Sequence, residues 1–181
     1  MAVWLHTVKK KFTEKLAIRW KCFSLEQLHS ERGTDFKLWE HPDVATRSLL
    51  ALKAAKCAEQ QGDHLFDAFH LLLFEAFHRE RKDTNSEEVL KTLAQKANLD
   101  IQRFMQDLRS DASWKLVGQD HEEAVERYRV FGVPALAFDQ QGALFLKLGS
   151  LPDADEEKVN LFNDIKALTQ RYPSLQEIKR T

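Results

Sequence analysis

The chain has 181 residues, of which 43% are hydrophobic and 30% charged, and 27 Lys and Arg against 28 Asp and Glu give a formal net charge of −1. This composition is sufficient for a packed core and excludes a disordered or low-complexity chain. A net charge close to zero gives no general attraction to nucleic acid or to a membrane surface, so we expect neither as a partner.

The first residues do not have the pattern of a secretory signal. The basic run Lys9 to Lys11 follows a short mixed stretch, whereas in a secretory signal the basic residues precede a long apolar one. No apolar run approaches the ~20 residues that cross a bilayer. We therefore expect a cytoplasmic protein, and in that compartment the two cysteines, Cys22 and Cys57, stay reduced.

The first 41 residues predict a helix, a strand and a loop. Residues 2–16 have helical spacing, with the apolar side chains along one side and most of the lysines elsewhere. Residues 17–25 alternate, which predicts a strand whose apolar face carries Ile18, Trp20 and Cys22. Residues 26–41 carry few periodic signals and predict a connecting loop that ends near Pro42.

Residues 43–130 predict five consecutive helices. The first runs from a cap at Asp43 or Thr46 to Gly62, and the second from His64 to about Arg79. The third runs from a cap at Asn85 or Ser86 to the break at 98–100, and a short fourth helix follows the cap at Asp100. The fifth runs from Asp111 to about Val130. The second helix is apolar on more than one side, so we expect it to be covered on more than one side.

After residue 130 the spacing of the apolar residues changes from helical to strand-like. Val133 to Phe138 predict a short strand, Asp139 to Gly142 a hairpin turn, and Ala143 to Leu148 the returning strand. A last helix is predicted from Asp153 to about Arg171, where Tyr172 and Pro173 end it.

Neither the cysteines nor the histidines have the spacing of a known site. Cys22 and Cys57 form no Cys-x-x-Cys motif, and each lies on an apolar face, where cysteines are usually inert core residues. A disulfide between them is disfavoured in the cytosol. No two histidines have the spacing that binds zinc on one helix face, so no metal site is expected.

One local motif, Gly132-Val133-Pro134-Ala135, opens the predicted hairpin. Proline cannot donate to a sheet ladder and therefore belongs at the first residue of a strand or at an edge. The Val133–Pro134 bond could be cis, which in a tight turn is often functional, or it could be an ordinary trans bond. The residues by themselves leave both alternatives open.

Several segments together resemble the DsbA-like branch of the thioredoxin superfamily, which includes DsbA oxidoreductases and proteins similar to 2-hydroxychromene-2-carboxylate isomerase. Trp4 to Val8 and Ile18 to Glu26 look like that branch's first helix and the strand after it. The other matching segments are Gln61-Gly62 with Leu65 to Phe69, Asn98 to Asp100, and Arg129 to Ala135, which looks like a cis-proline segment.

The resemblance implies an α/β fold, namely a thioredoxin-like fold with a large inserted α-helical subdomain. In a single domain of residues 1–181, residues 1–41 and 131–181 would form the thioredoxin-like part and 43–130 the insertion. Residues 17–25 and 134–148 would lie in one sheet region, and the Val133–Pro134 bond would be cis.

The resemblance also exposes a difference, because the branch's Cys-Pro-x-Cys motif and its first strand have no counterpart in this sequence. In the branch both precede the position matched by Trp4, so they would fall upstream of Met1. Two explanations fit: an N-terminally shortened version of a longer oxidoreductase, which we favour, or a diverged member that pairs its strands differently.

The function implied by the resemblance is that of a thiol–disulfide oxidoreductase acting on a disulfide-containing peptide or a small thiol. The implied substrate-binding residues are Trp4, Gly132, Val133 and Pro134, and Phe74 and Phe77 are candidates for a wall of the cleft. A transferase or isomerase that uses glutathione or a similar thiol is one alternative. A non-catalytic peptide-binding module is the other.

Overall fold

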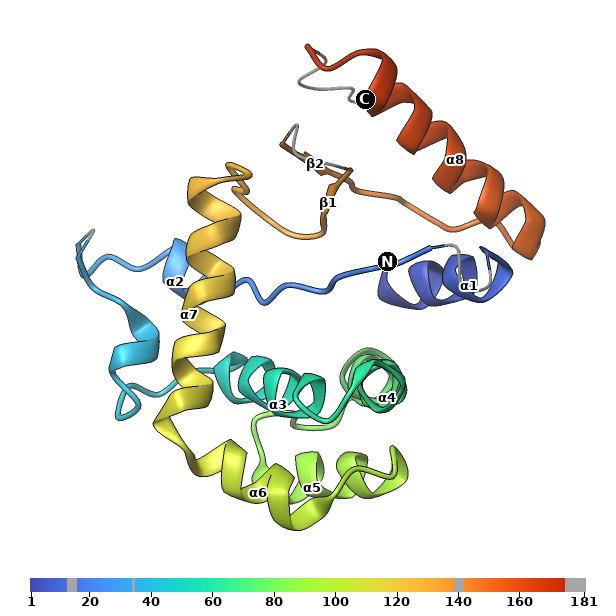
Figure 1. Cartoon of the computed structure of the whole chain (residues 1–181). Coiled ribbons are helices and arrows are strands. Elements are labelled where there is room, and N and C mark those ends of the chain that lie inside the picture. Colours follow the sequence, from blue (N-terminus) through green and yellow to red (C-terminus); the bar gives the residue numbers. More distant parts are fainter. Residues whose placement is uncertain (13–15, 34, 139–141, 175–181) are drawn as a thin grey trace. The chain divides into compact units, whose positions relative to one another are not determined.

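A computed structural model describes residues 1–12, 16–33, 35–138 and 142–174 (Figure 1). The chain divides into two compact units, one made of Met1–Trp20 and Glu123–Thr181 and the other of Lys21–Glu122. In chain order the elements are α1 (Ala2–Phe12), α2 (Leu25–Leu28), the 3₁₀ helix η2 (Leu38–Glu40), α3 (Leu49–Glu59), α4 (Asp63–His78), α5 (Glu87–Lys96), α6 (Ile101–Arg109), α7 (Asp111–Glu126), β1 (Ala135–Ala137), β2 (Ala143–Phe145) and α8 (Asp155–Arg171).

The core of the first unit lies between α1 and α8, which pack against each other (Figure 1). Trp4, Leu5 and Val8 are buried on one side of α1, as the helical spacing predicts, and Phe162 of α8 is buried with them. The Trp4 and Phe162 rings meet edge to face with their centroids 6.2 Å apart. The Trp4 indole Nε1 donates to the carbonyl oxygen of Lys158 at 2.9 Å, so this buried polar atom is satisfied.

The predicted hairpin is confirmed. Strands β1 and β2 pair antiparallel, with Leu136 opposite Leu144 and Ala135 opposite Phe145. Residues 139–141 of the predicted turn lie outside the described residues, and Gly142 has a φ of +106°, a conformation that side chains with a Cβ rarely adopt. Leu136, Phe138, Leu146 and Leu148 pack against the core between α1 and α8 and so attach the hairpin to it.

The predicted strand at 17–25 is wrong. Residues 16–24 are extended but form no strand, and the sheet in the described part of the chain contains β1 and β2 alone. The predicted alternation still appears in the burial, because Leu16, Ile18 and Trp20 pack on the core of their unit while Ala17 and Arg19 are exposed. Alternation reports one covered face, whereas a strand also requires backbone pairing with a neighbouring strand.

The predicted loop at 26–41 contains two short helical elements. Ser24 caps α2, since its Oγ accepts a hydrogen bond from the backbone N–H of Gln27 at 3.1 Å. The 3₁₀ helix η2 follows and buries Leu38 and Trp39. Both elements are too short for a periodic pattern to reveal them.

The predicted helices of the second unit are present, with shifted ends. In Figure 1, α3 to α6 gather together, with α3 packing on α4 and α6, and α5 packing on α4 and α6. Phe69 and Phe104 are fully buried between them, with ring centroids 5.5 Å apart. Asp100 caps α6 as predicted, because its carboxylate accepts from the Arg103 N–H at 3.0 Å.

The start of α3 differs from the prediction, since the helix begins at Leu49 and not at Asp43 or Thr46. The carboxylate of Glu26 accepts hydrogen bonds from the backbone N–H groups of Arg47 (2.8 Å) and Ser48 (3.2 Å). The backbone that enters α3 is therefore held by a residue more than 20 positions away, which local sequence cannot show.

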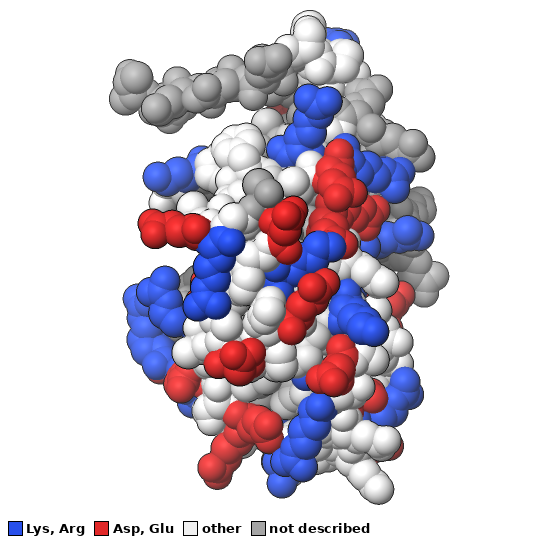
Figure 2. All heavy atoms as spheres, turned by 90° about the vertical axis from the view of Figure 1, so that its left-hand side faces the viewer, with Lys and Arg blue, Asp and Glu red and all other residues white. Residues whose placement is uncertain are grey.

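None of the described helices combines the length and the apolar character needed to span a bilayer. On the face that Figure 2 presents, basic and acidic side chains lie interspersed, without a large area of one sign.

Candidate functional site

The candidate site is centred on Pro134, at the start of the hairpin. The Val133–Pro134 peptide bond is cis. The Pro134 carbonyl oxygen accepts a hydrogen bond from the Leu146 N–H at 3.0 Å, which attaches the proline to the segment that follows β2. The position suits the residue type, because a proline at the entrance to a strand loses no ladder hydrogen bond.

An open hollow of about 310 Å³ lies beside Pro134. Its lining is mostly apolar and comprises Met1, Pro134, Leu146, Lys147, Leu148, Gly149, Ser150 and Leu151. Leu146 and Leu148 also pack on the core of this unit, so the lining rests on fixed structure. A hollow of this kind has room for an apolar side chain of a ligand.

Three large apolar side chains near Pro134 are exposed to solvent. Phe131, Val133 and Phe145 have exposed fractions of 70%, 42% and 39%, and we call them the apolar rim. The Phe131 and Phe145 rings lie with centroids 5.5 Å apart. Exposed aromatic side chains that contact one another are typical of surfaces that bind proteins.

The structure brings together three of the four predicted substrate-binding residues. Gly132, Val133 and Pro134 are contiguous here, and Gly132 lies beside the Phe145 ring, since a Cβ added to it would be in ordinary contact with that ring at 3.4 Å. Trp4 is fully buried in the core between α1 and α8 and does not reach this surface. Sequence reasoning missed Phe131 and Phe145, whose exposure no periodic pattern reveals.

The two candidates for a cleft wall lie on α4, in the other unit. Phe74 is half-buried and its ring stacks on His78 with centroids 5.6 Å apart. Phe77 is exposed and also contacts the His78 ring, at 4.9 Å. Their role stays a prediction.

Both cysteines are free and buried, as predicted for core residues. Burial raises the pKa of the Cys22 thiol well above its usual range, and the nearby Asp120 carboxylate raises it further. Burial also raises the pKa of the Cys57 thiol, which lies 3.5 Å from the Ser113 hydroxyl. Since the thiolate is the nucleophile in thiol–disulfide exchange, neither thiol is suited to that chemistry in the folded chain.

Two neighbouring residues of α7, Asp120 and His121, hold the segment after residue 20. The Asp120 carboxylate accepts from the Cys22 N–H at 3.0 Å and pairs with Lys21 and Lys56, each at 2.9 Å. The His121 Nδ1 accepts from the Ser24 N–H at 3.1 Å. Sequence reasoning missed both residues, because their partners lie almost a hundred positions away.

In the parts of the chain that are described, no group of three or more His, Cys, Asp or Glu side chains lies close enough together to hold a metal ion.

Two comparisons with known proteins match this chain. The model of a family described as thioredoxin matches residues 4–143. The ClpXP adapter protein SpxH of Bacillus licheniformis is 30% identical to this chain over 131 residues. Those residues are 72% of this chain and 42% of the relative, so the chain spans about two fifths of the relative's length.

Proposed function

Because this chain belongs to a thioredoxin family, we propose that it uses the surface around Pro134 to bind an extended segment of a partner protein, as a proteolytic adapter. One observation carries this proposal: the apolar rim of Phe131, Val133 and Phe145 is exposed, while both cysteines are buried. The name of the similar protein, a ClpXP adapter, supports the adapter role.

Binding of an extended segment at this place has a physical basis. Backbone groups near the start of a strand can pair with a peptide, while pockets beside them select its side chains. Here Gly132, Val133 and Pro134 would face the peptide backbone, and the hollow lined by Leu146 and Leu148 would take an apolar side chain. Trp4 would act indirectly, through the core that carries the hairpin.

A second candidate function is thiol–disulfide exchange of the DsbA type, on a disulfide-containing peptide or a small thiol such as glutathione. The observation that favours it is the segment Arg129 to Ala135 with its cis proline, which resembles that branch. In this candidate residues 1–41 and 131–181 are the thioredoxin-like part and 43–130 an inserted helical subdomain. The reaction would need a reactive cysteine other than Cys22 and Cys57.

Peptide selection tests the adapter proposal. Random dodecapeptides displayed on phage are selected on the immobilised chain, and the affinity of the selected peptides is measured by calorimetry. Val133→Asp places a charge in the apolar rim and should weaken binding about tenfold or more. Tyr172→Asp changes an equally exposed residue of the same unit, at the end of α8, and should leave the affinity within about twofold. Unchanged binding by Val133→Asp would contradict the proposal.

A degradation assay then separates an adapter from a simple binder. A selected peptide is fused to a stable reporter domain and incubated with purified ClpXP. The wild-type chain should accelerate loss of the reporter, and Val133→Asp should not. In parallel, reduction of insulin by dithiothreitol should proceed at the same rate with and without the chain. An acceleration of insulin reduction by the chain would favour the oxidoreductase instead.

A further inference from the structure

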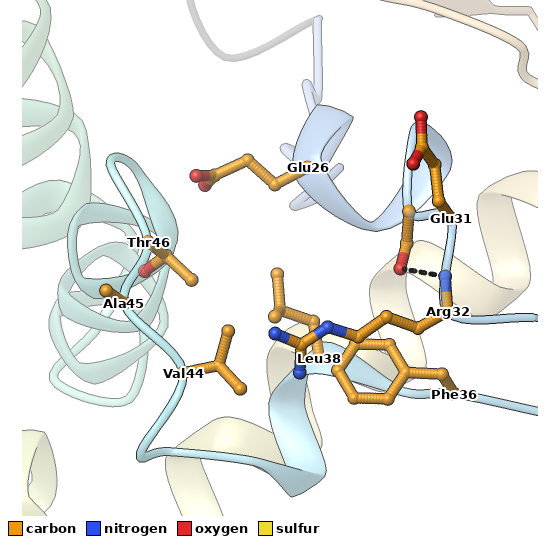
Figure 3. Close-up of a pocket in the computed structure, with 9 residues that line it drawn as sticks. Glu26, Glu31, Arg32, Phe36, Leu38, Val44, Ala45 and Thr46 are labelled. Atoms are coloured by element: carbon orange, nitrogen blue, oxygen red, sulfur yellow. Dashed lines mark hydrogen bonds between the residues drawn. The ribbon is translucent and has the colours of Figure 1, made fainter.

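A second hollow lies within the unit Lys21–Glu122, between α2, η2 and the segment that leads into α3 (Figure 3). Its volume is about 380 Å³, and it is lined by Glu26, Ser30, Glu31, Arg32, Phe36, Leu38, Val44, Ala45 and Thr46. None of these residues lines the hollow beside Pro134. The proposed function makes no use of this second hollow.

One wall of the hollow is held by the side-chain amide of Gln27. The amide Nε2 donates to the carbonyl oxygen of Phe36 at 2.7 Å, and the Oε1 accepts from the Leu38 N–H at 2.7 Å. Leu38 is itself buried in a core cluster with Cys22, Leu49 and Val117. This wall is therefore fixed to the core of the unit.

The opposite wall is held by Glu26 and Asn85. Besides the backbone N–H groups of Arg47 and Ser48, the Glu26 carboxylate accepts from the Ser48 hydroxyl at 2.8 Å. The Asn85 Nδ2 donates to the carbonyl oxygen of Thr46 at 2.7 Å. Because both walls are held by hydrogen bonds within the protein, the site is formed before any ligand arrives, which lowers the ordering cost of binding.

The cation in the hollow is Arg32, whose guanidinium carbon lies 4.9 Å from the centroid of the Phe36 ring. Among the described residues Arg32 forms no ion pair. Figure 3 shows its guanidinium extending toward Val44 and Leu38, while the Glu31 carboxylate points the other way. Glu26 also lines the hollow, and its carboxylate accepts three hydrogen bonds from residues 47 and 48, which hold it at the segment before α3.

We propose that this hollow binds a carboxylate that carries an apolar group. A guanidinium that lies over an aromatic ring can still donate hydrogen bonds from its N–H groups. Two of these N–H groups can bind the two oxygens of one carboxylate at the same time. Phe36, Leu38 and Val44 supply apolar surface beside it, and Ser30 and Thr46 add hydroxyls. A free carboxylic acid and the C-terminal residue of a polypeptide share this chemistry.

The test uses N-acetyl-leucine as the probe and N-acetyl-leucinamide, which lacks the charge, as its matched control. Each is titrated up to ~10 mM into the full chain, a range that detects millimolar binding, while ¹H–¹⁵N spectra are recorded. The acid should shift the amide signals of residues 36–38 and 44–46 in a saturable way, and the amide should bind at least about tenfold more weakly.

Two variants locate the site. Arg32→Gln keeps a planar polar group but removes the charge, and it should weaken binding of N-acetyl-leucine at least about tenfold. Arg47→Gln removes a neighbouring exposed arginine that does not line the hollow, and it should change the affinity by less than about twofold. No saturable shift, equal binding of the amide, or full binding by Arg32→Gln would each overturn the proposal.

A third comparison identifies the source of the carboxylate. A tetrapeptide that ends in leucine with a free carboxylate is compared with free leucine and with N-acetyl-leucine. Tighter binding of the tetrapeptide would assign the site to a polypeptide C-terminus, and equal or weaker binding to a small acid. Since the variants at Arg32 and Val133 lie in different units, failure of this proposal and failure of the peptide site are distinguishable.

Discussion

His121 shows how a single buried side chain can tie stability to pH. Its Nδ1 accepts from the Ser24 N–H, so the bond requires the neutral ring. The ring lies against Phe23 and Trp39, with centroids at 4.6 and 5.3 Å. Burial lowers the pKa of His121, although the charge of Glu122 opposes this effect.

The lowered pKa predicts a loss of stability in mild acid. Below the ordinary histidine pKa of about 6.5, His121 is protonated in the unfolded chain but remains neutral in the folded chain until the pH is lower. The unfolded chain therefore binds more protons, and the free energy of unfolding falls as pH decreases. His121→Asn keeps an acceptor oxygen near the Nδ1 position but does not titrate. Urea unfolding at several pH values should therefore show a smaller decrease for the variant than for the wild type. Equal decreases would contradict this role.

At the scale of elements, three helices end on a residue with positive φ that is not glycine. Arg81, Asn98 and Arg129 have φ values of 57°, 59° and 53°. After α7 the Val130 N–H donates to the carbonyl oxygen of Ala124 and the Arg129 N–H to that of Val125. These bonds reach one residue further back than those of a Schellman motif, but the turn likewise places a residue at positive φ, where glycine is usual. The sequence prediction placed the end of α7 near Val130 because no glycine marks the stop before Gly132.

Arg129→Gly should therefore stabilise the chain. Glycine removes the steric cost of a Cβ at positive φ, about 1–2 kcal/mol, and about half of that gain is offset by its greater freedom when unfolded. We expect a net increase of about 0.5–1 kcal/mol in the free energy of unfolding, measured in urea. Arg129→Ala removes the same side chain but keeps the Cβ, so it should show no such increase. A gain of equal size in both variants would point to the arginine side chain instead.

At the scale of the whole molecule, the two buried thiols report on its unfolding. Cys22 and Cys57 are both in the unit Lys21–Glu122, and both have raised pKa values because they are buried. A reagent for thiolates can reach them only when that unit opens.

Labelling with Ellman's reagent should therefore be slow in buffer and complete in guanidinium chloride. Two thiols per chain should react in the denatured state, and the rate in buffer should rise with added urea as the unit opens. A single added surface cysteine, Tyr172→Cys, provides a thiol that should react at once under both conditions. Fast labelling of the folded wild-type chain would contradict the buried positions of its own thiols.

Features that depend on neighbouring residues could be predicted from the sequence. The spacing of α1, the helices between residues 49 and 126, the Asp100 cap and the hairpin around Gly142 were all predictable, because periodicity and capping act within one or two turns of chain. The alternation predicted for residues 17–25 matches the covered side chains of Ile18, Trp20 and Cys22 and the exposed ones of Arg19 and Lys21. It fails at Phe23, which was predicted on the opposite face and is buried as well. The division into a thioredoxin-like part and an insertion stays a prediction.

Features that depend on partners far along the chain could not be predicted in this way and became visible in the folded chain. Within the described part of the chain residues 16–24 pair with no strand, Glu26 holds the backbone that enters α3, and Asp120 and His121 hold the backbone of residues 22 and 24. The exposure of Phe131 and Phe145 and the position of the Arg32 guanidinium over the Phe36 ring also belong here. Local patterns show which faces can be buried, but which backbone groups are paired and which side chains remain exposed depends on the packing of distant segments.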